Sequence, residues 1–201
     1  MLELFGQDSL GPNTGRRFRH WLRSRGWMPD QFHERTALIE ALDGPWSRDL
    51  SELLSVASFA HARYRSLVRG SAPIDPFFLA YVINVSVVLS AADDVSHYHP
   101  EHRIVTYPSR ADVRREHFDI FHELAHALLG SDDHHADVQI LGVCLGVDRA
   151  IVQAVTSRHG FSEGLRALVR QHPDLQPWQV VTATFFYTVQ ARWIADKQAE
   201  P

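Results

Sequence analysis

The chain has 201 residues, a formal charge of −4 at pH 7, and hydrophobic residues at 45% of its positions. This composition is that of a soluble globular protein with one good-sized core, so a single domain over residues 1–201 is expected. The acidic balance argues against a general nucleic-acid or membrane-surface binder. The only cysteine, Cys144, lies in an apolar run and indicates a core thiol in a reducing compartment. The N-terminus lacks the pattern of a signal peptide, which favours a cytoplasmic protein.

The N-terminal part of the chain predicts helices. Residues 1–15 end in a cluster of turn-forming residues and are expected to form a flexible lead-in, whereas residues 16–80 are expected to be mainly helical. Arginines alternate with aromatic residues between 16 and 27, which is typical of a short amphipathic helix with a solvated basic face. From Ser47, a candidate N-cap, apolar residues keep helical spacing up to Gly70.

Two strands are predicted in the middle of the chain. Residues 82–89 are rich in β-branched side chains and residues 103–107 form a second short run of the same kind, with a polar loop over 91–101 between them. The loop and the residue after it contain three histidines, His97, His99 and His102, which could bind a metal. No carboxylate or thiol pattern accompanies them, so the favoured interpretation is that they are solvated.

Helical patterns return after these strands and continue to the C-terminus. Residues 110–116 lead into an apolar helical run that ends at Gly130, a candidate C-cap. Further helices are predicted over 131–145, 148–158, 161–171 and 177–197. The predicted fold class is therefore α+β and predominantly helical.

The motif His122-Glu123-Leu124-Ala125-His126 lies on the most apolar of these helices. Residues four apart project from one face of a helix, so His122 and His126 can bind one metal ion. Glu123 is rotated from His122 by about 100°, which places its carboxylate beside such an ion, as a general base for a water molecule. The alternative is that both histidines are buried in the core and find hydrogen-bond partners there without a metal ion. The acidic residues that follow Gly130 favour the metal, because a third ligand is needed there.

The order of these features resembles the ImmA/IrrE-type zinc metallopeptidases over about residues 82–150. The resemblance rests on the strand at 104–107, the pair Arg114-Arg115, Phe118, the segment 122–129, and the run 133–138 in the following helix. It implies a zincin-like core of the gluzincin kind, in which a small β-sheet lies against the motif helix, with extra helices before and after it.

The resemblance also implies roles for individual residues. His122 and His126 would be zinc ligands, Glu123 the catalytic base and Asp133 the third ligand. Aspartate stands where the family usually has glutamate, so Asp137, one helical turn later, is an alternative. His134 or His135 would be a weaker competitor for the same position.

The activity implied is that of a bacterial, zinc-dependent endopeptidase that cleaves a regulatory protein such as a transcriptional repressor, without itself contacting nucleic acid. The substrate is expected to lie extended along the edge of the strand at 103–107. One alternative is a catalytically inactive protein of zincin fold that acts by binding another protein. Another is a metal-dependent hydrolase of non-peptide substrates.

Overall fold

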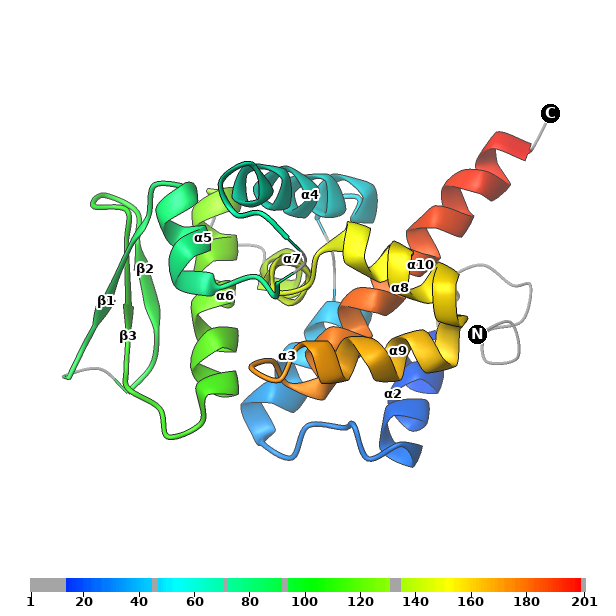
Figure 1. The fold of residues 1–201 in the computed structure, drawn as a ribbon. Helices are drawn as coiled ribbons and strands as arrows, with labels where there is room; N and C mark the ends of the chain where they lie inside the picture. The colour runs from blue at the N-terminus through cyan, green and yellow to red at the C-terminus, as the bar shows by residue number, and fades with distance from the viewer. Residues whose placement is uncertain (1–13, 45–46, 71, 92–93, 131–134, 200–201) are drawn as a thin grey trace.

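The computed structural model describes residues 14–44, 47–70, 72–91, 94–130 and 135–199, with side chains of the last helix described up to Thr188. Helices dominate this part of the chain, and a three-stranded sheet stands at one side of them (Figure 1). The prediction of a mostly helical α+β fold is confirmed. Buried apolar side chains from the N-terminal, central and C-terminal helices join in one core cluster.

Two helices precede the long helix of the N-terminal part. The first, α2 (Thr14–Ser24), buries Phe18 and Leu22 while several of its arginines are exposed, so the predicted amphipathic helix is confirmed. The second, α3 (Phe32–Asp43), was not singled out from the sequence. It buries Ala37, Leu38 and Ala41 and lies against α7 (His135–Leu145).

Each of the next two helices has an aspartate at its N-cap position, which in the first of them is Asp49 and not the predicted Ser47. Helix α4 (Leu50–Leu67) has Asp49 at its N-cap position, and Ser47 is hydrogen-bonded elsewhere. Helix α5 (Pro76–Val82) is started by Asp75, whose carboxylate accepts hydrogen bonds from the main-chain N–H groups of Phe77 and Phe78. Because this cap and Pro76 favour a helix, the predicted strand over 82–89 is wrong in its first half.

The sheet has the strand order β1-β3-β2. Strand β1 (Ser86–Leu89) runs parallel to β3 (Ile104–Tyr107), and β2 (His97–His99) runs antiparallel to it. Strand β2 lies where the sequence predicted only a loop. Since β3 is paired on both sides, the expectation that a substrate lies along its edge is wrong, and main-chain pairing with a substrate has to use an outer strand.

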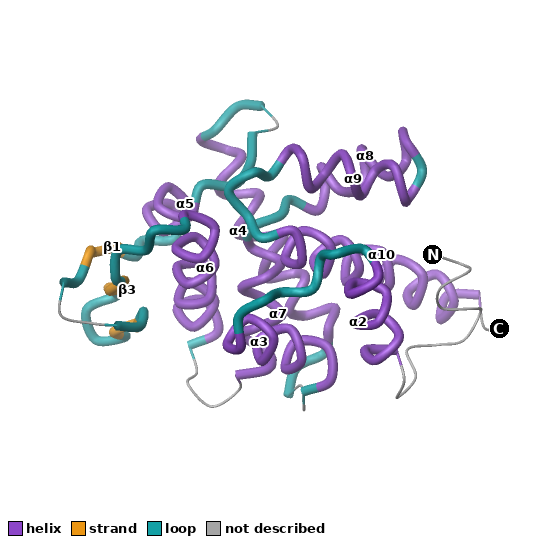
Figure 2. Tube along the Cα trace, turned by 90° about the horizontal axis from the view of Figure 1, so that it is seen from below, coloured by secondary structure: helices purple, strands orange, loops and turns teal. Residues whose placement is uncertain are grey.

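Helices α5 and α6 (Val113–Leu129) lie between the sheet and the remaining helices (Figures 1 and 2). Helix α7 is central, because it contacts α3, α4, α6 and α10 (Pro177–Ala199), and all its residues from Ala136 to Leu145 are buried. Helices α8 (Arg149–His159) and α9 (Phe161–Gln171) lie close to their predicted ranges, and they pack on each other. Within the described chain, no single helix is both long enough and apolar enough to cross a membrane. Helices α7 and α8, which are bent by 61° relative to each other, have the required length and composition only when taken together.

Gly142 permits a close approach between α6 and α7. A Cβ atom at this position would lie 3.1 Å from His122 Cα and 3.4 Å from His122 N, which are backbone atoms of the neighbouring helix. A larger residue would therefore require one helix to shift. The two helices thus approach each other closely at the first histidine of the predicted metal motif.

Candidate metal centre

Helix α6 carries the predicted motif in its C-terminal half, and both of its ends are defined by local interactions. The Asp112 carboxylate accepts a hydrogen bond from Arg114 N at 3.0 Å, as an N-cap does. At the other end Gly130 adopts a φ of 68°, and its N–H donates to the carbonyl of His126 at 2.9 Å. This left-handed C-cap ends the helix one turn after the last histidine of the motif.

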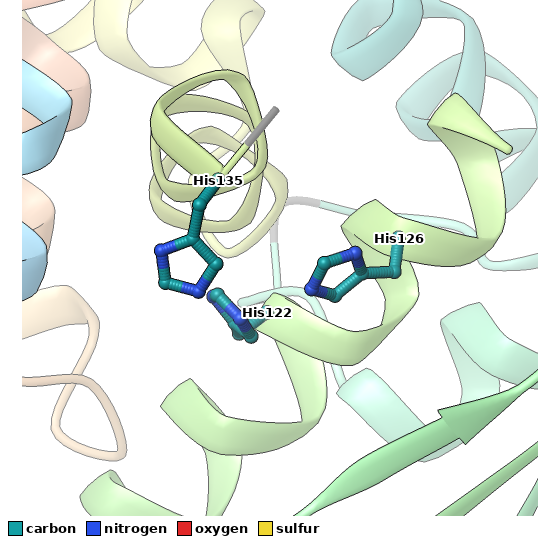
Figure 3. Close-up of side chains that lie close together, drawn as sticks. All are labelled: His122, His126 and His135. Atoms are coloured by element: carbon teal, nitrogen blue, oxygen red, sulfur yellow. The ribbon is translucent and has the colours of Figure 1, made fainter. Parts of the chain in front are cut away.

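Three imidazoles from α6 and α7 meet at one point. His122 and His126 lie one helical turn apart on α6, and His135 comes from the first turn of α7 (Figure 3). Their candidate ligand atoms all lie within 4.8 Å of one another. The ring centroid of His122 is 5.0 Å from that of His126 and 5.0 Å from that of His135. Three nitrogen ligands in such an arrangement leave a fourth position open, which is typical of a catalytic zinc site.

The protonation of His122 suits metal binding. Burial, and to a smaller extent the neighbouring His126 and His135, lower its pKa from 6.5 to about 3. The ring is therefore neutral at physiological pH and keeps a lone pair on one nitrogen, which a metal ligand requires. Its Nδ1 is buried and has no hydrogen-bond partner among the described residues. A buried polar nitrogen without a hydrogen-bond partner lowers the stability of the fold. The cluster therefore fits a site for a bound cation better than a core that holds no metal.

The other residues predicted for the site have different positions. Glu123 follows His122 on α6 and has only 8% of its surface exposed. Asp133, the predicted third ligand, and His134 lie outside the described residues. Asp137 is fully buried, and its carboxylate accepts hydrogen bonds from Ser47 N at 3.1 Å and from the Ser47 hydroxyl. The third member of the described cluster is His135, so the geometry favours the weaker competitor of the sequence analysis over Asp137.

A residue that the sequence did not indicate also contacts the cluster. Glu40, on α3, accepts a hydrogen bond from His135 Nδ1 at 2.8 Å and a longer one from Gln139 Nε2 at 3.3 Å. Glu40 and His135 are 95 positions apart in the chain. No local pattern could have linked them, because only the packing of α3 on α7 brings them together.

Charged residues continue along the same face of α6 toward its N-terminus. Arg115 and Asp119 lie seven and three positions before His122, a spacing that places them on the same side of the helix. Asp119 is paired with Arg110, whose Nε lies 3.3 Å from its carboxylate. Glu34 is close enough to Arg115 and Asp119 for both to affect its pKa. The predicted loop histidines are not members of the described histidine cluster, and His99 on β2 contacts Thr106 Oγ1 at 3.2 Å.

Comparison with known proteins gives a match for the centre of the chain. Residues 82–140 match the model of the Peptidase_M78 family, described as the IrrE N-terminal-like domain. A comparison with curated proteins found no match. The matched segment runs from the end of α5 into α7 and contains all three clustered histidines, whereas α3 and Glu40 lie outside it. The resemblance identified in the sequence is confirmed over this segment.

Proposed function

On the premise that residues 82–140 form an IrrE N-terminal-like peptidase core, we propose that this protein is a zinc-dependent endopeptidase that cleaves a specific regulatory protein, such as a transcriptional repressor. The family match supports a metallopeptidase-type function. The observation that carries the proposal is the meeting of His122, His126 and His135, because it supplies a three-nitrogen ligand set beside the glutamate of the motif.

The roles of the residues follow from their chemistry. His122, His126 and His135 hold the metal through neutral ring nitrogens. When bound, zinc supplies a Lewis acid that polarises a peptide carbonyl and favours ionisation of water. Glu123, as general base, accepts the proton of the attacking water and then donates it to the leaving amine. The low exposure of Glu123 limits competition from bulk solvent for its carboxylate.

The substitution Glu123→Gln tests this proposal, because it keeps the size of the side chain and removes the base. The variant is expected to bind zinc as the wild type does while its kcat/KM falls by about 10²–10⁴-fold. Cleavage is measured by mass spectrometry on a library of unstructured peptides and on purified repressors encoded near the protein's gene. Glu163→Gln is a suitable control, because Glu163 is exposed and pairs with Arg166 on α9.

The outcomes separate the peptidase from its alternatives. Cleavage that survives both Glu123→Gln and removal of metal by a chelator would refute the proposal. A wild type that binds zinc and a protein partner but cleaves neither peptides nor the partner would instead support the catalytically inactive binding protein. Hydrolysis restricted to small amides or esters would indicate a non-peptide substrate.

A further inference from the structure

The first turn of α7 is held by the end of α3 and the residues after it. Glu40 accepts a hydrogen bond from His135, and the Ser47 main chain and hydroxyl donate to Asp137. Between them, Gly44 lies so close to Ala136 that a Cβ on Gly44 would be 2.7 Å from the Ala136 Cβ. Three consecutive residues of α7, 135 to 137, therefore each contact this N-terminal segment.

The Glu40–His135 contact fixes which ring nitrogen of His135 is available. When Nδ1–H donates to a carboxylate, the lone pair of the neutral ring is on Nε2. Histidines that bind metals commonly have such a carboxylate behind them, and it fixes both the tautomer and the orientation of the ring. The side chains of His135 and Glu40 are 53% and 35% exposed, so the pair itself contributes little to stability. Its effect is expected on metal binding instead.

The same carboxylate oxygen also contacts Gln139, a residue that lies close to a second histidine of the cluster. Glu40 Oε2 accepts the 3.3 Å hydrogen bond from Gln139 Nε2, and Gln139 is 5% exposed. The Gln139 side chain in turn lies close to the His122 imidazole. Glu40 is thus linked directly to one histidine of the cluster and through Gln139 to another.

We propose that Glu40 is a positioning residue of the metal centre that acts through His135, so that helix α3 completes a site whose ligands lie in α6 and α7. The inference rests on the proposed zinc site. It adds that the IrrE-like segment 82–140 depends on a carboxylate supplied from outside it. Without Glu40 the His135 ring can rotate and change tautomer, and the zinc affinity falls.

The test is a zinc titration of the full-length, metal-free protein in competition with a chromophoric chelator. Glu40→Ala is expected to weaken zinc binding about 10–100-fold, and His135→Ala at least as much. Glu40→Gln keeps an oxygen that can accept from Nδ1 and should recover part of the loss. Glu163→Ala, which removes an exposed and ion-paired carboxylate from α9, should bind zinc as the wild type does.

A double-mutant cycle separates positioning from a general structural effect. In the His135→Ala background, Glu40→Ala should cause a much smaller loss of zinc affinity than it causes in the wild type, because only the indirect link through Gln139 remains. The unfolding midpoint of the metal-free protein should be the same with and without Glu40. Substitution of cobalt for zinc gives a visible absorption spectrum that should change in Glu40→Ala and remain unchanged in Glu163→Ala.

The results distinguish this inference from the proposed function. If the wild type binds zinc and Glu40→Ala binds it equally well, the inference is overturned while the peptidase proposal stands. Equal losses from Glu40→Ala with and without His135 would also overturn it, because the effect would not pass through His135. A wild type that binds neither zinc nor cobalt overturns both.

Discussion

Glu34, near the start of α3, is expected to make stability depend on pH in an unusual direction. It is 3% exposed, and its buried Oε1 has no hydrogen-bond partner within the part of the chain that the structure describes. Burial is the largest cause that raises its pKa from 4.5 to about 7, and Arg115 partly opposes the shift. Nearby carboxylates add to it: Asp112, Asp119 and Asp30.

The sign and the size of the effect follow from this shift. The folded state holds the proton of Glu34 more tightly than the unfolded state, so the free energy of unfolding falls as pH rises between 4.5 and about 7. Below this window the carboxyl is neutral in both states and there is no penalty. Above it, a shift of this size corresponds to a penalty of up to about 3 kcal/mol. Glu34→Gln removes the charge and should stabilise the protein by up to that amount at about pH 8, but not below about pH 4.5.

Urea denaturation of the metal-free wild type and of Glu34→Gln over this pH range measures the difference directly. Groups distant from Glu34 titrate equally in both proteins, so the difference in unfolding free energy reports Glu34 together with its coupling to the neighbouring charged groups. Glu52→Gln, which changes an exposed carboxylate that pairs with Arg48, should give a nearly constant difference. A Glu34→Gln variant that is less stable than the wild type at about pH 8 would refute the reasoning, since it would mean that ionised Glu34 is stabilised by Arg115.

Three further predictions concern the packing around α7. Gly142→Ala should destabilise the metal-free protein by about 1–3 kcal/mol and should also weaken zinc binding, because the new Cβ displaces the backbone at His122. Unchanged urea unfolding and an unchanged zinc titration would contradict this. Tyr187→Phe should lower the free energy of unfolding, measured with urea, by about 1–3 kcal/mol, because the buried hydroxyl donates to the carbonyls of Cys144 and Val147 at 2.9 and 3.0 Å. An unchanged free energy of unfolding would mean that these carbonyls find other donors. The Cys144 thiol is fully buried and burial raises its pKa, so a disulfide reagent should label it only as fast as the protein unfolds. Rapid labelling of the native protein would contradict this and would show that the core opens locally.

The elements that the sequence predicted well are those with strong local signals. Helix α6 has an apolar stripe and a C-cap glycine, and α8 begins after Asp148, whose carboxylate accepts from Ala150 N. Strand β2 has the polar sequence His-Tyr-His and becomes a strand only because β3 pairs with it. Helix α3 mixes buried alanines with charged residues, so the apolar spacing that indicates a helix is weak in its sequence. Its place in the fold becomes clear only from its packing on α7.

The candidate site divides in the same way. His122, Glu123 and His126 belong to one helical turn, so their relation is fixed by helix geometry and can be read from spacing. The third position depends on how α7 packs on α6, and spacing could not choose between the residues near its start. The structure brings His135 to the cluster and leaves Asp137 with Ser47. Glu40 depends on a third helix and could not be predicted.

Because the three histidines are divided between two helices, a metal ion bound by all of them would couple metal loading to tertiary folding. In an unfolded chain His122 and His126 have no fixed partner, because the ring of His135 arrives only when α7 docks on α6. An ion held by all three would act as a crosslink between the helices, and each tenfold rise in its free concentration above Kd would add about 1.4 kcal/mol to the folded state. Depletion of the ion would therefore loosen the centre of the fold as well as stop the proposed catalysis.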